Sequence, residues 1–474
     1  MTRPMGIGTE MLGKPGHILW EARQLRPAAK LKTSSYEAEN AAFHRGWKPG
    51  RFRRSEMSPI RSSRRKQFPL WRLGAIRHRA HALAAVALLC SFVTGCADSV
   101  RPTTTPSGNP MQRVKVLTYN TLHGLEPSGL TVKASESKEA RQARLNLQFQ
   151  QLSLVQADVV LLQEVNPLPA MAERFVKALK TSGLQYSEVH QVDACGMRVA
   201  GLAVVPDLNN GLAVLTKAPL KLRKIKGLKL SGGFGGCRDF VGLQTGELRY
   251  ALIAEIENPN TGRKFLAVSL HLHSGIERNA FFIQKINEAI EEGRARREDF
   301  EGIVAAMEQD QERRLDEIRL LLKEIQKLQA EALYFGVIIG GDFNFEPDDP
   351  EYRELERAGL RDTYMIASPT SDVYSLDPQR NPIAGQAVRE VPSGLREAMA
   401  RLPDSQQQRI LEGYRKGISE ARRVDFLFLM HNASESLTGC LRQELFGQPT
   451  AVSAEPGSDH YGVLAMYIAD SSQC

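Results

Sequence analysis

The segment Gly340-Gly341-Asp342-Phe343-Asn344 constrains the fold of this chain more than any other. It follows residues 335–339, an apolar run rich in β-branched side chains. A run of this kind that stops at two glycines predicts a buried strand ending in a tight turn. The Asp342 carboxylate and the Asn344 amide would then stand at a strand end. An ordinary polar turn could carry the same residues, so the rest of the chain must decide between the two interpretations.

Two other predicted strands also end on side chains that can bind a cation. Residues 114–120 alternate like a half-buried strand and end on Asn120. The apolar run at 159–162 continues through Gln163 to Glu164. Both strands therefore deliver an oxygen ligand to a strand end.

A hairpin signal at Asn258-Pro259-Asn260-Thr261-Gly262 precedes a strand predicted at residues 265–273. Side chains alternate between the two faces of a strand, so His271 and His273 are predicted to share one face.

Residues 423–429 form another apolar strand-like run, and this run embeds the Asp425 carboxylate. An unpaired buried carboxylate is costly, so Asp425 needs a partner. The sequence Ser458-Asp459-His460 precedes the last predicted strand, at 463–468, and His460 is the obvious partner.

Taken in order, these motifs resemble the endonuclease/exonuclease/phosphatase superfamily, which includes deoxyribonuclease I-like nucleases, neutral sphingomyelinases and inositol polyphosphate phosphatases. The resemblance covers roughly residues 113–470. It implies an α/β fold, a four-layer α/β/β/α sandwich of two packed mixed sheets with outer helices. The interleaved strand and helix signals, with helices predicted at 138–155 and 171–181, agree with this architecture.

The resemblance also implies a metal-dependent phosphoesterase that binds Mg²⁺, with Mn²⁺ as the alternative. Glu164 would be the principal metal ligand, with Asn120 beside it and Asp459 as a further ligand. His460 would be the general base and Asp425 would orient it. Asp342 and Asn344 would position the water and the phosphate, and His271 would stabilise the charged transition state. His273 lies outside the family pattern, so it is either a supporting group or an ordinary surface histidine.

The residues leave the substrate open. The segment Asp377-Pro378-Gln379-Arg380-Asn381 resembles the Asp-Pro-x-x-Asn element of sphingomyelinase-like members, although Leu376 replaces the usual aromatic residue. We therefore expect a monomeric enzyme that hydrolyses phosphodiesters or phosphomonoesters of the phospholipid type. The alternatives are an exported endonuclease or exonuclease acting on nucleic acid, and a non-catalytic binding module anchored at the cell surface.

The formal charge of +8 belongs to the N-terminal part of the chain. Residues 1–95 contain 18 of the 62 Lys and Arg but only 5 of the 54 Asp and Glu, so the chain from Cys96 onward has a net charge of −5. Tight binding of duplex nucleic acid depends on Lys and Arg that neutralise phosphates, so this balance argues against it.

A basic stretch leads into the apolar residues 82–93, which are too few to span a membrane but suit a signal-peptide core. The sequence Val93-Thr94-Gly95-Cys96 resembles a bacterial lipoprotein box, which predicts an exported protein held at the membrane by a lipidated Cys96, on the periplasmic or outer-membrane side. The alternatives are an uncut signal-anchor and a plain signal peptide. Residues 57–96 would be the signal and 97–112 a flexible tether. Residues 1–56 would be either translated upstream of a true start at Met57 or a disordered arm.

Four cysteines remain after Cys90 and Cys96, and an even number in an exported protein allows disulfides. We favour the pairs Cys195–Cys237 and Cys440–Cys474 over the two other connectivities.

Two helical insertions are expected within the domain at 113–474. The first, 277–333, has apolar residues at spacings of three and four, which fits a helix on its own sheet or a coiled-coil partner surface. We favour packing on its own sheet. The second, 382–422, precedes Asp425 and is either a substrate lid or a solvated helix pair.

Overall fold

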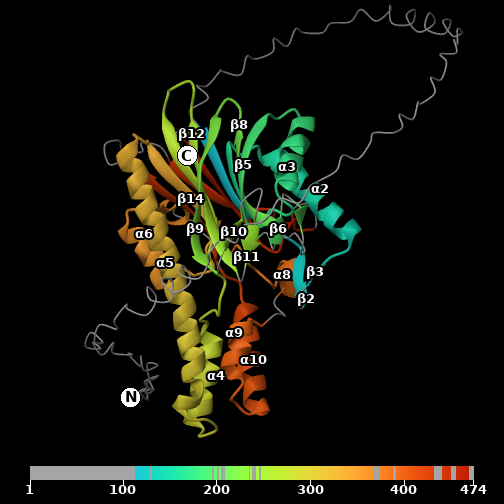
Figure 1. Cartoon of the computed structure of the whole chain (residues 1–474), viewed down its shortest axis with the longest axis vertical. Helices are drawn as coiled ribbons and strands as arrows, with labels where there is room; N and C mark the ends of the chain where they lie inside the picture. The colour runs from blue at the N-terminus through green and yellow to red at the C-terminus, as the bar shows by residue number, and fades with distance from the viewer. Residues whose placement is uncertain are drawn as a thin grey trace, which may run out of the picture. The chain divides into compact units, whose positions relative to one another are not determined.

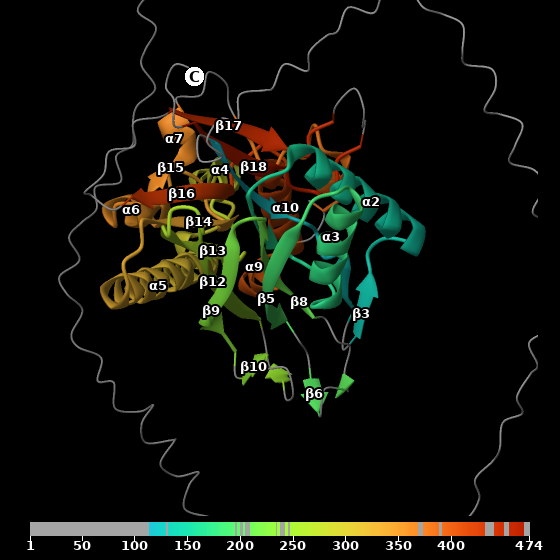
Figure 2. The ribbon, with the colours of Figure 1, turned by 90° about the horizontal axis from the view of Figure 1, so that it is seen from above.

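The computed structural model describes residues 113–128, 131–194, 197–199, 202–203, 209–233, 235–237, 242–244, 247–367, 373–387, 391–431, 440–449 and 455–468. Two six-stranded sheets pack face to face, with helices on both outer faces (Figures 1 and 2). The predicted α/β/β/α sandwich is therefore confirmed.

The first sheet is mixed, because β1 pairs in parallel with β4 and antiparallel with β18. The run predicted from its unbroken apolar sequence, β4, is buried along its whole length. In spatial order the strands are β17 (Cys440–Phe446), β18 (Gly462–Ile468), β1 (Arg113–Asn120), β4 (Val159–Gln163), β8 (Asn210–Lys217) and β5 (Tyr186–Ala194).

The second sheet is mixed in the same way, with β13 parallel to β14 and β14 antiparallel to β16. The predicted hairpin joins β12 to β13, and its Gly262 has a φ of 68° that suits glycine. In spatial order the strands are β15 (Arg361–Asp362), β16 (Asp425–His431), β14 (Gly336–Asp342), β13 (Lys264–His271), β12 (Leu248–Glu257) and β9 (Lys221–Gly232).

Three apolar layers hold the sandwich together. The middle layer lies between the sheets, and each outer layer lies between one sheet and its helices. Figure 2 shows α2 and α3 on one side and α5 and α6 on the other. The bounds of these helices are α2 (Lys138–Val155), α3 (Ala170–Thr181), α5 (Glu301–Glu331) and α6 (Pro350–Arg357).

The two glycines of the opening motif lie inside β14, so the predicted turn before Asp342 is wrong. Both glycines are required by close packing. A Cβ on Gly340 would come within 2.7 Å of the Leu161 side chain on the opposite sheet, and a Cβ on Gly341 would collide with the backbone of Leu270. The strand continues to Asp342. The missing side chain at Gly340 leaves room for Leu161 of the opposite sheet, and the one at Gly341 leaves room for the backbone of the neighbouring strand β13.

A polar contact also joins the sheets near the ends of these strands. Gln163 is fully buried and its Nε2 donates to Ser269 Oγ at 3.0 Å, while Ser269 Oγ donates to the carbonyl of Leu162 at 3.0 Å. These hydrogen bonds fix the end of β4 against β13. Glu164 directly follows Gln163, so it is attached to this fixed strand end.

The two insertions form one helical module, which we define as α4 (Ala280–Glu291), the first half of α5, α9 (Ser393–Met399) and α10 (Asp404–Ile418). Figure 1 shows these helices together at the lower end of the molecule. They bury a joint apolar core that includes Phe282, Ile303 and Ile410. An ion pair between Arg422 and Glu277 joins the bases of the two insertions.

The apolar stripe predicted on α5 packs on the second sheet, through Ile318, Leu321 and Ile325. This agrees with the favoured interpretation and not with a free coiled-coil surface.

Short elements complete the described chain: the hairpin β2 (Leu125–Ser128) and β3 (Thr131–Ala134), a small sheet of β10 (Gly235–Cys237), β11 (Gly242–Gln244), β6 (Met197–Val199) and β7 (Leu202–Ala203), and the helices α7 (Thr363–Ala367) and α8 (Pro382–Ala387), with a 3₁₀ turn at Arg297–Phe300. No helix among the described residues is long and apolar enough to cross a membrane. Cys440 is disulfide-bonded, but its predicted partner Cys474 and the predicted Cys195–Cys237 pair lie outside the side chains that the structure describes.

Candidate active site

All eight predicted site residues lie in one connected group at one edge of the sandwich. Asn120, His271 and Asp342 end their strands, and Asp425 begins β16. The remaining members stand in the loops that follow or precede a strand, namely Glu164, Asn344, Asp459 and His460.

Asn120 joins two carboxylates that come from different sheets. Its Nδ2 lies 3.1 Å from Glu164 Oε1 and 3.1 Å from Asp342 Oδ2. Its Oδ1 accepts a hydrogen bond from the backbone N–H of Leu122 at 3.1 Å. In this orientation Asn120 holds the carboxylates together, and its predicted role as a metal ligand stays a prediction.

Glu164 is presented by a strained backbone and by a histidine that the sequence reasoning missed. Its φ is 56°, in the left-handed region that residues with a Cβ rarely adopt. The backbone N–H of His123 donates to Glu164 Oε2 at 2.9 Å, and His123 Nε2 lies 3.6 Å from the same oxygen. Although burial opposes it, the nearby His123 and the hydrogen bonds from the His123 backbone and Asn120 hold the pKa of Glu164 below its usual range. His123 lies three residues beyond Asn120, and this closeness to a predicted strand end is the sequence signal that could have identified it as a site residue.

His460 and Asp425 form a short hydrogen-bonded pair. His460 Nδ1 lies 2.7 Å from Asp425 Oδ2, and His460 Nε2 faces Asp342 Oδ2 at 3.9 Å. Burial opposes a charged imidazole, but Asp425, Asp459 and Asp342 raise the pKa of His460 well above its ordinary value.

His271 lies between the two carboxylates that Asn120 joins. Its Nδ1 is 3.9 Å from Glu164 Oε1 and its Nε2 is 3.5 Å from Asp342 Oδ2. Burial, followed by the positive charge of Arg249, lowers the pKa of His271 to about 3. His271 is therefore a neutral imidazole at physiological pH.

Asn344 and Asp459 complete the group. The Asn344 backbone N–H donates to Asp342 Oδ1 at 3.1 Å, and its Nδ2 donates to the carbonyl of Leu272 at 3.0 Å. Asp459 Oδ1 accepts from Ser458 Oγ at 3.0 Å, and burial raises the pKa of Asp459.

His273 does not share the face of His271 as predicted, because β13 ends at His271 and strand alternation ends with it. His273 Nδ1 lies 2.6 Å from Glu247 Oε2, and Nε2 lies 2.7 Å from Asp310 Oδ1 on α5. It therefore links the second sheet to the helical module and is not part of the site.

The donors at this site fit a hard divalent cation. Burial and then the charge of Asp425 raise the pKa of Asp342 to about 7, which marks an excess of negative charge that a cation would relieve. His271 Nδ1 and Asp425 Oδ1 are buried and have no hydrogen-bond partner among the described residues. Asp342, Asp425 and His460 form one possible ligand set for a metal ion. Each offers a ligand atom, and these three atoms all lie within 4.8 Å of one another. Carboxylate and amide oxygens are the ligands that Mg²⁺ prefers.

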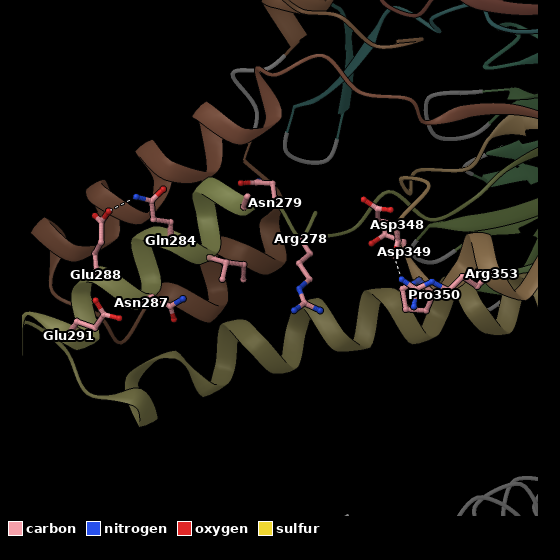
Figure 3. A pocket seen from close by; sticks show the side chains of 12 residues that line it. Arg278, Asn279, Gln284, Asn287, Glu288, Glu291, Asp348, Asp349, Pro350 and Arg353 are labelled. Atoms are coloured by element: carbon pink, nitrogen blue, oxygen red, sulfur yellow. Dashed lines mark hydrogen bonds between the residues drawn. The ribbon is translucent and has the colours of Figure 1, made fainter. Parts of the chain in front are cut away.

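A groove of about 850 Å³ lies elsewhere, between α4 and the start of α6 (Figure 3). Arg278 and Gln284 line one side and Asp349 and Arg353 the other. The groove contains none of the predicted site residues, so it is separate from the candidate active site.

Residues 117–460 match the family model described as the Endonuclease/Exonuclease/phosphatase family. The chain therefore belongs to this family, whose fold supports hydrolysis of phosphoric esters. No curated protein sequence matches the chain.

Solved structures show a distant likeness. Truncated TDP2 from Caenorhabditis elegans is 15% identical, with 75% of this chain and 97% of that chain covered and a TM-score of 0.42. An endonuclease/exonuclease/phosphatase from Bacteroides vulgatus is 16% identical, with 75% and 98% covered and a TM-score of 0.42. A mannosyl-6-phosphatase from Bacteroides thetaiotaomicron is 14% identical, with 74% and 98% covered and a TM-score of 0.40.

Proposed function

We propose that this protein is a magnesium-dependent phosphoric ester hydrolase whose substrates are phosphodiesters or phosphomonoesters of the phospholipid type. The observation that carries the proposal is the His460–Asp425 hydrogen bond of 2.7 Å, set against the pair of carboxylates that Asn120 joins. In this proposal a base with an orienting carboxylate lies beside the site that would hold the cation.

In the proposed reaction, a water attacks phosphorus and His460 Nε2 takes its proton. Nδ1 donates to Asp425, so Nε2 is the nitrogen that can accept. Asp425 holds the ring in this orientation and stabilises the imidazolium that forms. Because the surrounding carboxylates raise the pKa of His460, the ring must release the proton on Nε2 before it can accept one from water.

The other residues would position the reactants. Asp342 faces His460 Nε2 and can orient the attacking water, and Asn344 holds Asp342 through its backbone N–H. His271, as a neutral imidazole, can donate one hydrogen bond to a phosphoryl oxygen in the transition state. The phosphorus–oxygen bond to the leaving group then breaks, its electron pair stays on the leaving oxygen, and this oxygen takes a proton from solvent.

Glu164 and Asp459 are the carboxylates that would hold the metal, with Asn120 beside them. When bound, Mg²⁺ would neutralise charge on the phosphoryl oxygens and on the leaving oxygen, and Mn²⁺ is the alternative cation.

The substrate class is inferred from charge and from the N-terminal sequence. The chain from Cys96 onward carries a net charge of −5, which disfavours tight binding of a duplex through its phosphates. A lipidated Cys96 would keep the enzyme at a membrane surface, where phospholipids are concentrated.

A panel assay tests the function. Purified residues 97–474 with Mg²⁺ would be offered sphingomyelin, phosphatidylinositol phosphates, plasmid DNA, RNA and bis-p-nitrophenyl phosphate, with EDTA as the control. We expect hydrolysis of a phospholipid that EDTA abolishes. Cleavage of DNA or RNA alone would make the protein a nuclease, and a protein that binds no metal and cleaves nothing would be a binding module.

Membrane attachment needs a separate test. We expect Cys96→Ser to move the full chain from the membrane fraction to the soluble fraction without changing turnover. A Cys96→Ser protein that still fractionates with membranes would contradict the lipoprotein proposal.

A further inference from the structure

The Asp425–His460 pair lies across the two sheets of the sandwich. Asp425 begins β16 in the second sheet, whereas His460 precedes β18 in the first. No shared ladder of backbone hydrogen bonds sets the register between these strands. A contact of 2.7 Å between the two side chains therefore needs another element to fix both backbones.

That element is the segment from Ser375 to Asn381, in which Ser375, Asp377 and Asn381 are buried whereas Gln379 and Arg380 are exposed. Ser375 is fully buried, and its Oγ accepts hydrogen bonds from the backbone N–H of Val424 at 3.1 Å and of Asp425 at 3.0 Å. Its carbonyl accepts from the backbone N–H of Tyr461 at 2.7 Å. One residue thus holds the backbone of Asp425 and the backbone next to His460.

Asn381 holds the other side of the His460 loop. It is fully buried, and its Nδ2 donates to the carbonyls of Ser458 at 2.9 Å and Asp459 at 3.0 Å. Its Oδ1 accepts from the backbone N–H groups of Ile383 and Ala384, at 3.0 and 3.3 Å, at the start of α8. Both ends of the amide are therefore occupied by backbone, and the side chain does not face a substrate.

The segment is itself anchored to the strand that carries Asp425. Leu376 and Arg422 exchange two backbone hydrogen bonds, of 3.0 and 2.7 Å, just before β16 begins. The segment can therefore transmit the position of β16 to the loop that carries His460.

We infer that Ser375 and Asn381 are positioning residues that set the geometry of the Asp425–His460 pair. The inference rests on the proposed function for its kinetic consequence, but not for its structural one. A reacting group misplaced by about 1 Å can lower a rate by about 10²-fold. The inference also gives the Asp-Pro-x-x-Asn element a structural role. Asn381 supports the loop that carries His460, so its presence carries no information about the substrate class.

The test compares Ser375→Ala, which removes the acceptor, with Ser375→Thr, which keeps it, and with Ser153→Ala, a serine on α2 outside this network. We expect Ser375→Ala to lower kcat about 10- to 100-fold with KM and Mg²⁺ affinity within about twofold of the parent. Ser375→Thr should recover most of the loss. Asn381→Asp, which replaces the donor by an acceptor, should lower both kcat and Mg²⁺ affinity, because it also displaces Asp459.

A second readout does not need activity. The imidazole N–H proton of His460 that is bonded to Asp425 should give a downfield NMR resonance, assigned by its loss in His460→Ala. We expect Ser375→Ala and Asn381→Asp to shift or broaden it while their circular dichroism matches the parent. A folded Ser375→Ala protein that keeps both the parent's kcat and this resonance would overturn the inference. A parent that cleaves no substrate removes the proposed function, but the resonance still decides the positioning.

Discussion

His460 Nδ1 lies 2.7 Å from Asp425 Oδ2, although the two residues belong to loops and strands of different sheets. Because Asp425 occupies Nδ1, only Nε2 of His460 is left for proton transfer, and Nε2 faces Asp342 Oδ2. The first prediction concerns the unequal roles of the two partners.

His460→Ala should lower turnover by roughly 10²–10⁴-fold, the usual contribution of a positioned general base. Asp425→Asn should lose less, because the remaining amide can still contact the ring. His190→Ala, a histidine on β5 paired with Glu188, is the matched control and should keep the parent's rate. If Asp425→Asn were far more damaging than His460→Ala in folded proteins, the assigned roles would be reversed.

The second prediction concerns the cation. Glu164→Gln keeps the size of the side chain but removes the charge that holds a hard cation. Magnesium affinity, measured by calorimetric titration, and turnover should therefore fall together. Glu188→Gln on β5 should change neither. Equal magnesium binding by the parent and Glu164→Gln would remove Glu164 from the metal site.

The third prediction is a pH dependence of stability. Both ring nitrogens of His273 lie within hydrogen-bond distance of carboxylates, so both donate and the ring is an imidazolium. Asp310 and Glu247 raise its pKa despite burial, and Arg313 opposes them. Glu317 also faces this residue, through its backbone N–H at 3.0 Å.

The raised pKa of His273 determines how the stability of the fold changes with pH. Charged His273 stabilises the fold fully below the pKa of an unfolded histidine, about 6.5, and this stability is lost as pH rises through the higher folded pKa. His273→Gln should cost about 1.5–3 kcal/mol at pH 6 for each charged hydrogen bond it removes. Chemical unfolding from pH 6 to 9 should show the difference between parent and variant shrinking with pH. A difference that stays constant would mean that the pKa of His273 is the same in the folded and the unfolded chain.

The fourth prediction concerns the helical module. Phe282 on α4 is fully buried and meets Tyr414 on α10 edge to face, with ring centroids 5.3 Å apart. Phe282→Ala should cost about 3–5 kcal/mol, and hydrogen exchange should quicken in α4 and α10 together, although they come from separate insertions. Leu154→Ala, at a position 70% exposed on α2, is the control. If α10 kept its protection, the two insertions would be independent units.

Much of the sandwich could be predicted because strand patterns and strand ends are local. The runs that end on Asn120 and Glu164 carry their own hydrophobic signal, and so does the hairpin before His271. The grouping of the candidate site residues could be predicted because these strand ends meet at one edge of the sandwich. The paired glycines were misread because glycine occurs both at turns and where a strand packs closely against the opposite sheet or a neighbouring strand.

The joint core of the insertions could not be predicted. An apolar stripe on a helix shows that one face is buried, but not which partner buries it. Phe282 and Tyr414 are far apart in the sequence and meet only through tertiary packing. His123 was missed for the same reason, because its contact with Glu164 joins two loops.

The placement of β1 has a consequence for biogenesis. This strand lies between β4, which follows it closely in the chain, and β18, which is the last strand described. While the nascent chain is being made, β1 can pair with β4 but its other edge stays open, and an open apolar edge invites pairing with other chains. Until β18 has been synthesised, this edge of β1 has no partner strand in the first sheet, so the sheet can be completed only after the chain has reached residues 462–468.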